Sequence, residues 1–343
     1  MQPHRSGIII HDAVPLPKIL ELARQADEKG FWGVFMTEEA GHNTMMALAA
    51  VAQLTTRVMV GSGICSVFTR SATIYAMGAN TLNTLSSGRA ILGLSTSPPF
   101  YVKHWHHTPF EHPVSRVRDY ILIARQILEN SQEKLNYKGK AVQADDFIFA
   151  CPGPSNRIPL WIGAIGPQMI ELAGEIADGV LLSPLLSEEY LEFAIKHVKI
   201  GAERGRRDWR EVEIAAPIIT TVDTDGAQAL EWARSMLTYF SIVYYFDQLY
   251  VHSGHAEFHK KLGQLNKEKG YMAARDSVPD DIVRKFSIVG TPEECRQRVS
   301  ELRGAGLTLP VHNAPGPRRI YNQPVRVPVP QYQLAENIVR YLP

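Results

Sequence analysis

Cysteine is scarce in this chain of 343 residues, which holds only Cys65, Cys151 and Cys295 and no C-x-x-C pair. The odd number and the wide spacing argue against a disulfide framework and against a structural zinc site. Such cysteine usage is typical of a protein that works in a reducing compartment. We therefore expect a cytoplasmic location.

Long apolar runs and blocks of like charge are also missing. The first apolar run, Ile8 to Ile10, is too short for a signal-peptide core. No uninterrupted apolar window reaches the roughly 18 residues of a membrane-spanning helix. The 36 basic and 35 acidic residues leave a formal charge of +1, so we expect neither a nucleic-acid surface nor a membrane surface. Apolar residues at 45% and charged residues at 21% are ordinary for a globular protein.

Short apolar runs, rich in β-branched residues, alternate with longer helical patterns along the chain. The runs predicted to be strands are 7–11, 31–37, 57–61, 89–94, 160–163, 179–182, 212–222 and 307–312. The helices are expected at 15–30, 44–54, 72–85, 114–128, 168–176, 188–204 and 334–341. Strands without a wet face indicate a parallel sheet covered on both sides. Their number favours an α/β fold of the closed (β/α)8 TIM-barrel type over an open doubly wound sheet.

Two stretches interrupt the alternation. Residues 130–158 read as a loop or a short hairpin. Roughly 80 residues separate the last two predicted strands, far more than a usual connection. This segment holds an aromatic helical run at 227–251 and a basic helix near 255–269. We interpret residues 225–290 as a helical insertion over the barrel mouth or at a subunit contact, within a single domain spanning 1–343.

A carboxylate pair follows the second predicted strand. Active sites of such barrels are built from the loops after the strands. Glu38 and Glu39 would lie there, where mutual repulsion in a partly dry mouth raises one pKa toward that of a general acid. The alternative is an acidic pair favoured by the dipole of the helix that begins near Asn43. Adjacent residues of an extended strand end point to opposite sides, so only one of the two can face the reaction.

A glycine-rich stretch, Gly163 to Pro167, follows the fifth predicted strand and opens a helix. Its backbone N–H groups and the helix N-terminus suit an anion, to which Ser95 and Thr96 would add donors. The alternative is a plain turn with Pro167 at the first helical position. The stretch is not a P-loop, because no Gly-Lys-Ser/Thr follows.

A histidine-rich segment with His104, Trp105 and His107 is the one metal-like cluster. It contains prolines and no regular helical ligand pair, so we expect no metal there. A loop facing the substrate, with Trp105 as an apolar wall, fits better. No pattern typical of a serine or cysteine nucleophile occurs.

Five segments together resemble the luciferase-like monooxygenase superfamily, in its branch of coenzyme F420-dependent oxidoreductases that includes methylenetetrahydromethanopterin reductase. They are GFWGVFMTEEAG (30–41), RVMVGSGICSVFTRSA (57–72), TLSSGRAILGLSTS (84–97), PLWIGAIGPQMIELAGEIADGVLL (159–182) and FSIVGTPEECRQRVSELRGAG (286–306). The fourth is the most specific. The resemblance covers essentially the whole chain.

The resemblance implies a barrel with a helical insertion, a homodimer, and a flavin-like ring across the barrel mouth. It also implies a non-prolyl cis peptide at Gly63–Ile64. The implied cofactor ligands are Thr37, Gly63, Ile64, Cys65, Ser95, Thr96, Ala164, Ile165, Gly166, Pro167 and Ser183. The residues expected to face the substrate are His42, Trp105 and His107.

The function implied by the resemblance is hydride transfer between deazaflavin coenzyme F420 and a small organic substrate. One alternative is an FMN-dependent monooxygenase, and another is a non-catalytic flavin-binding barrel. Reductases of this branch often carry Asp-His where this chain has Glu38-Glu39. Glu39 matches the catalytic histidine, so we expect Glu39 to act as the acid or base and Glu38 as its partner. This departure leaves the substrate open.

Overall fold

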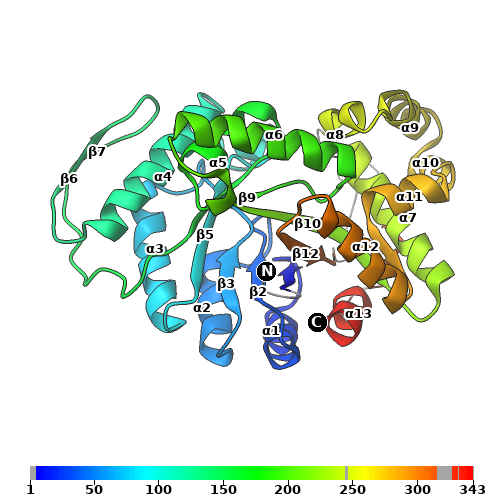
Figure 1. Cartoon of the computed structure of the whole chain (residues 1–343), viewed down its shortest axis with the longest axis horizontal. Helices are drawn as coiled ribbons and strands as arrows, with labels where there is room; N and C mark the ends of the chain where they lie inside the picture. The colour runs from blue at the N-terminus through cyan, green and yellow to red at the C-terminus, as the bar shows by residue number, and fades with distance from the viewer. Residues whose placement is uncertain (1–4, 244–245, 315–326, 331, 343) are drawn as a thin grey trace.

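The computed structural model describes residues 5–243, 246–314, 327–330 and 332–342. Eight strands, each parallel to the next, form a closed barrel with helices around it (Figure 1). In order around the barrel they are β1 (Gly7–Ile10), β2 (Gly33–Met36), β3 (Met59–Ser62), β5 (Ala90–Ser95), β8 (Leu160–Gly163), β9 (Gly179–Leu181), β10 (Glu213–Val222) and β12 (Leu309–Asn313). Pairing of β12 with β1 closes the ring. The predicted (β/α)8 fold is confirmed.

The apolar character of both strand faces has a direct structural cause. One face of each strand points into the barrel, where side chains from seven strands form a single inner cluster: Ile9, Phe35, Ile91, Trp161, Leu181, Ala215, Leu309 and Val311. The neighbouring residues, such as Ile8 and Val34, point outward into the larger core beneath the helices. Because successive side chains alternate between these two buried layers, none of the eight barrel strands presents a face to solvent.

The helices that cover the barrel begin and end close to the predicted positions, with the exception of Pro292–Gly304, which the sequence did not predict. They are α1 (Leu16–Lys29), α2 (Thr44–Leu54), α3 (Ala72–Leu85), α4 (Pro113–Glu129), α5 (Pro167–Ile176), α6 (Glu188–Arg204), α12 (Pro292–Gly304) and α13 (Gln333–Tyr341). Side-chain oxygens of Asn43, Ser71 and Ser187 accept backbone N–H groups at three of the N-termini, as expected of N-cap residues.

Two excursions leave the barrel at opposite ends of the molecule (Figure 1). The segment predicted as a loop or hairpin forms the antiparallel strands β6 (Leu135–Lys138) and β7 (Gln143–Phe147). Between β10 and β12 the chain forms α7 (Gly226–Val243), α8 (Asp247–His252), α9 (Ala256–Lys269), α10 (Tyr271–Asp276) and α11 (Asp280–Phe286). The short strand β11 (Ile288–Gly290) then pairs with the far end of β10. The sequence pattern identified neither β11 nor α12.

The aromatic run of the insertion is buried within the chain itself. Tyr239, Phe240, Phe246 and Tyr250 are each at most 5% exposed. The Tyr250 ring lies 4.9 Å from that of Phe286, centroid to centroid. The burial predicted for this run therefore holds for these residues, whereas Tyr244 and Tyr245 lie outside the described residues. Across the described ranges, no helix has the length and apolar character needed to span a membrane.

We propose that residues 1–343 form one domain, because buried residues of α7 such as Leu237 share a continuous core with barrel residues such as Ile218. Calorimetry is expected to record a single unfolding transition. Two resolved transitions would show that the insertion unfolds separately.

Candidate active site

A cavity of about 440 Å³ opens at the ends of the barrel strands where the loops to the helices begin. Ten of the residues predicted from those strand ends line it together: Thr37, Glu38, Glu39, Gly63, Ile64, Ser95, Thr96, Ala164, Ile165 and Gly166. They come from loops more than 100 residues apart in sequence, and the closed barrel brings them to one mouth.

Six other predicted residues are not part of this lining. Cys65 is fully buried on β4 (Cys65–Ser66), and burial raises the pKa of its thiol. Ser183 is also buried, with its Oγ accepting the N–H of Leu185 at 3.2 Å. Pro167 is the first residue of α5. His42 and His107 are exposed, and the Trp105 ring stacks on Tyr101 at 3.9 Å.

An apolar wall completes the cavity with residues that the sequence did not single out. Phe110 comes from the segment before α4, and its ring stacks on Phe68 with centroids 4.9 Å apart. Phe246 comes from the insertion, where it precedes α8. Met169 and Pro217 add to the same wall. The cavity thus combines backbone, hydroxyl and carboxylate groups with an apolar surface.

The peptide bond between Gly63 and Ile64 is cis, as predicted. The Gly63 N–H donates to the Met36 carbonyl at 2.8 Å. Two glycines of neighbouring strands make room for the Ile64 side chain: a Cβ on Gly163 would lie 3.1 Å from Ile64 Cγ2, and one on Gly93 would lie 3.4 Å from it. Ile64 therefore sits in the cavity floor between two strands that lack side chains at those positions.

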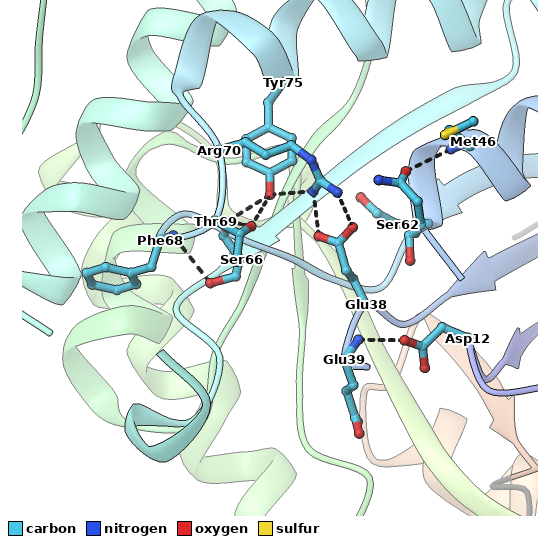
Figure 2. Close-up of polar contacts among 12 residues, drawn as sticks. Asp12, Glu38, Glu39, Met46, Ser62, Ser66, Phe68, Thr69, Arg70 and Tyr75 are labelled. Carbon is cyan, nitrogen blue, oxygen red and sulfur yellow. Dashed lines mark hydrogen bonds and ion pairs between the residues drawn. The ribbon is translucent and has the colours of Figure 1, made fainter. Parts of the chain in front are cut away.

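Glu38 is held by an arginine from the loop before α3. Its two oxygens accept from the two terminal nitrogens of Arg70, each at 2.7 Å (Figure 2). This hydrogen-bonded carboxylate raises the pKa of the Arg70 guanidinium. Arg70 also donates to the Tyr75 hydroxyl at 3.2 Å, and that hydroxyl donates to the Ser66 carbonyl at 2.7 Å. The carboxylate of Glu38 is thus fixed to the β4–α3 side of the cavity.

Glu39 points away from Glu38, as expected for neighbours on an extended strand end (Figure 2). Its backbone N–H donates to Asp12 Oδ2 at 2.8 Å, and the N–H of Gly41 donates to the same oxygen at 2.8 Å. A Cβ on Gly41 would lie only 2.2 Å from the Asp12 carbonyl oxygen. Asp12, which is 1% exposed, therefore holds the loop that carries Glu39 tightly against the end of β1.

His11 also faces Glu39, with its Nε2 3.4 Å from Glu39 Oε1. Neither His11 nor Asp12 was among the candidates drawn from the sequence, which came from strands two to six. The signal was present, because His11 is the last residue of the first predicted strand and Asp12 directly follows it. Within the described ranges, no group of three His, Cys, Asp or Glu side chains is arranged to hold a metal ion.

Comparison with known proteins gives a consistent family signal. The sequence profile described as luciferase-like monooxygenase matches residues 1–309. A curated relative named 5,10-methylenetetrahydromethanopterin reductase, from Methanolobus tindarius, is 29% identical over 316 residues. The alignment covers 91% of this chain and 95% of the relative.

Two solved structures share the architecture. The coenzyme F420-dependent tetrahydromethanopterin reductase from Methanopyrus kandleri superposes with a TM-score of 0.85 at 24% identity, covering 99% of this chain and 98% of that one. The oxygenating constituent of 3,6-diketocamphane monooxygenase from Pseudomonas putida, in complex with FMN, gives a TM-score of 0.67 at 16% identity, with 99% and 98% covered. At these identities the likenesses concern the fold.

Proposed function

Because the chain belongs to the luciferase-like monooxygenase family, we propose that it is an oxidoreductase that transfers a hydride between coenzyme F420 and a small organic substrate. The relative from Methanolobus tindarius is named as a reductase, which supports an oxidoreductase function for this chain. The observation that carries the proposal is the cavity itself. A polar rim and an apolar wall enclose Glu39, while its neighbour Glu38 is already committed to Arg70.

The residues of the cavity fit a flat ring with an anionic side chain. Ile64 would provide an apolar floor for the ring, and Thr37, Gly63, Ser95 and Thr96 would provide polar contacts around it. The Ala164 N–H already donates to the Leu181 carbonyl at 2.9 Å, so we assign the anionic group to the N–H groups of Ile165 and Gly166 at the start of α5. A Cβ on Gly166 would have nothing within 4 Å, which leaves space for this group.

A bound deazaflavin would supply a hydride donor or acceptor, and the protein would supply the proton. We assign proton transfer to Glu39, because Asp12 fixes its backbone and its carboxylate faces the cavity. Glu38 keeps the Arg70 charge compensated beside it. The apolar wall with Phe110 and Phe246 would exclude water from the reacting atoms.

FMN is the second candidate cofactor, favoured by the likeness to the FMN-bound monooxygenase from Pseudomonas putida. Absorption spectra of the purified protein, reconstituted with each cofactor and then desalted, separate the two. Retention of the F420 band with loss of FMN supports the proposal, and retention of FMN alone supports a monooxygenase. Failure to retain either would favour a barrel without this activity. We also propose that the enzyme is a cytoplasmic homodimer, which sedimentation and cell fractionation test.

Gly166→Asp is expected to weaken F420 binding at least tenfold, because a carboxylate would stand beside the anionic group of the cofactor. The fold should survive, since the space beside this glycine is open. Fluorescence titration with F420 measures the affinity. Gly166→Asn is the matched control, having the same shape without the charge. Equal affinities for the two variants would show that the anionic group of the cofactor does not bind beside Gly166.

A further inference from the structure

We propose that His11 is a positioning residue that holds and resupplies the proton of Glu39. This inference rests on the proposed function. His11 lies at the end of β1 and is 9% exposed. Its Nε2 is buried, and within the described part of the chain no hydrogen bond of regular geometry reaches that atom. The nearest carboxylate oxygen that faces it is Glu39 Oε1, at 3.4 Å.

The other ring nitrogen of His11 fixes where the proton resides. The backbone N–H of Ala13 donates to Nδ1 at 3.2 Å. A nitrogen that accepts a hydrogen bond carries no proton, so the neutral ring has its proton on Nε2, the nitrogen turned to Glu39. Asp12 Oδ1 lies 3.0 Å from Nδ1 and would stabilise the ring when both nitrogens are protonated.

Two carboxylates thus flank one imidazole. The charged groups facing the ring are Asp12, on its own strand end, and Glu39, on the loop after β2. Glu38, the next residue on that loop, is turned to Arg70 and does not take part. The same Asp12 carboxylate that flanks the ring also accepts the backbone N–H of Glu39, so the three residues form one unit.

For reduction of a carbonyl group, reduced F420 would be the hydride donor. The hydride adds to the carbonyl carbon, the Glu39 O–H bond breaks, and its proton goes to the carbonyl oxygen. The His11 ring, when protonated on both nitrogens, then gives its Nε2 proton to Glu39, so that an N–H bond breaks and an O–H bond forms. The proton that remains on Nδ1 in this transient tautomer faces Asp12 Oδ1, and Nε2 regains a proton from water. A reduced deazaflavin that gives up a hydride would release a proton to solvent, so the protons taken up and released would balance over a turnover.

The first experiment uses the protein without cofactor and is independent of the proposed function. Nitrogen-15 NMR of the histidine side chains is expected to show the proton of neutral His11 on Nε2. This resonance should shift in Glu39→Gln. The chain offers a matched control, because His197 and Glu171 form a second pair, with Nδ1 and Oε1 2.7 Å apart. Glu171→Gln should shift His197 and leave His11 unchanged. A proton on Nδ1, or no response to Glu39→Gln, would overturn the inference.

The second experiment measures kcat against pH with F420 and a carbonyl substrate. In the wild type we expect kcat to fall as pH rises, because the transfer to Glu39 needs a protonated imidazole. His11→Gln should lose this fall and run about ten- to a hundredfold slower, less than the loss of the acid itself. KM should change little, and His197→Gln should behave as wild type. An unchanged pH profile in His11→Gln would contradict the role of His11, whereas failure to bind F420 would contradict the proposed function alone.

Discussion

Glu39→Gln is expected to lower the rate of hydride transfer by about 10²–10⁴-fold, the usual effect of removing a general acid. The amide keeps the shape of the side chain and cannot give up a proton. The Asp12 contact with the loop uses the backbone N–H of residue 39, so the loop should stay in place. Single-turnover kinetics with reduced F420 measures the rate, and fluorescence titration should show affinity within about twofold of wild type.

Glu38→Gln is the comparison that separates the two adjacent carboxylates. It removes the charge that compensates Arg70, so it should lower stability while reducing the rate less than Glu39→Gln does. Turnover of Glu39→Gln within a few-fold of wild type would place the acid elsewhere. A larger rate loss in Glu38→Gln would exchange the roles assigned to the two residues.

The second large effect is expected from Gly93→Ala, in the middle of β5. A Cβ there would lie 2.2 Å from the Ser62 carbonyl oxygen of β3, which is backbone and has little freedom to move. The strands must separate, at a cost of roughly 1–3 kcal/mol or more in the free energy of unfolding. Because the same Cβ would lie 3.4 Å from Ile64 Cγ2, the floor of the cavity should shift and F420 affinity should fall with stability.

Gly166→Ala provides the matched control for this substitution. The chemical change is identical, but a Cβ at Gly166 has nothing within 4 Å. Denaturant unfolding should therefore give a stability within about 0.5 kcal/mol of wild type. If Gly93→Ala were equally stable, the close approach of β3 and β5 would not constrain the residue at this position.

The barrel could be predicted because each of its strands is marked by a short run of consecutive apolar residues in the sequence. A run such as Leu160–Gly163 is apolar on both faces, and the helices between the runs fix their parallel direction. The sequence did not predict strand β11, because its three residues, Ile288–Gly290, are too few to show a periodicity. It becomes a strand only because the long β10 extends beyond the barrel and offers it a partner.

The candidate site was predictable to the extent that it follows from strand ends. Two of the misses lie one residue beyond the lining: Cys65 follows Ile64 and Ser183 follows Leu182, and both are buried outside the cavity. The pairing of Glu38 with Arg70 joins residues 32 positions apart, and no local pattern indicates it. Phe246 reaches the cavity from the insertion, whose placement depends on tertiary packing.

The ion pair between Arg70 and Glu38 also determines how many protons the cavity can exchange. An arginine remains charged at every working pH, so it cancels the charge of Glu38 throughout a reaction cycle. Among the described residues that line the cavity, Glu39 is then the remaining ionisable side chain. Under the proposed function, the cavity would accordingly alternate between two charge states that differ by one. Adding a hydride to a carbonyl group also requires one proton. The single proton that Glu39 can give therefore matches the number needed for each two-electron reduction.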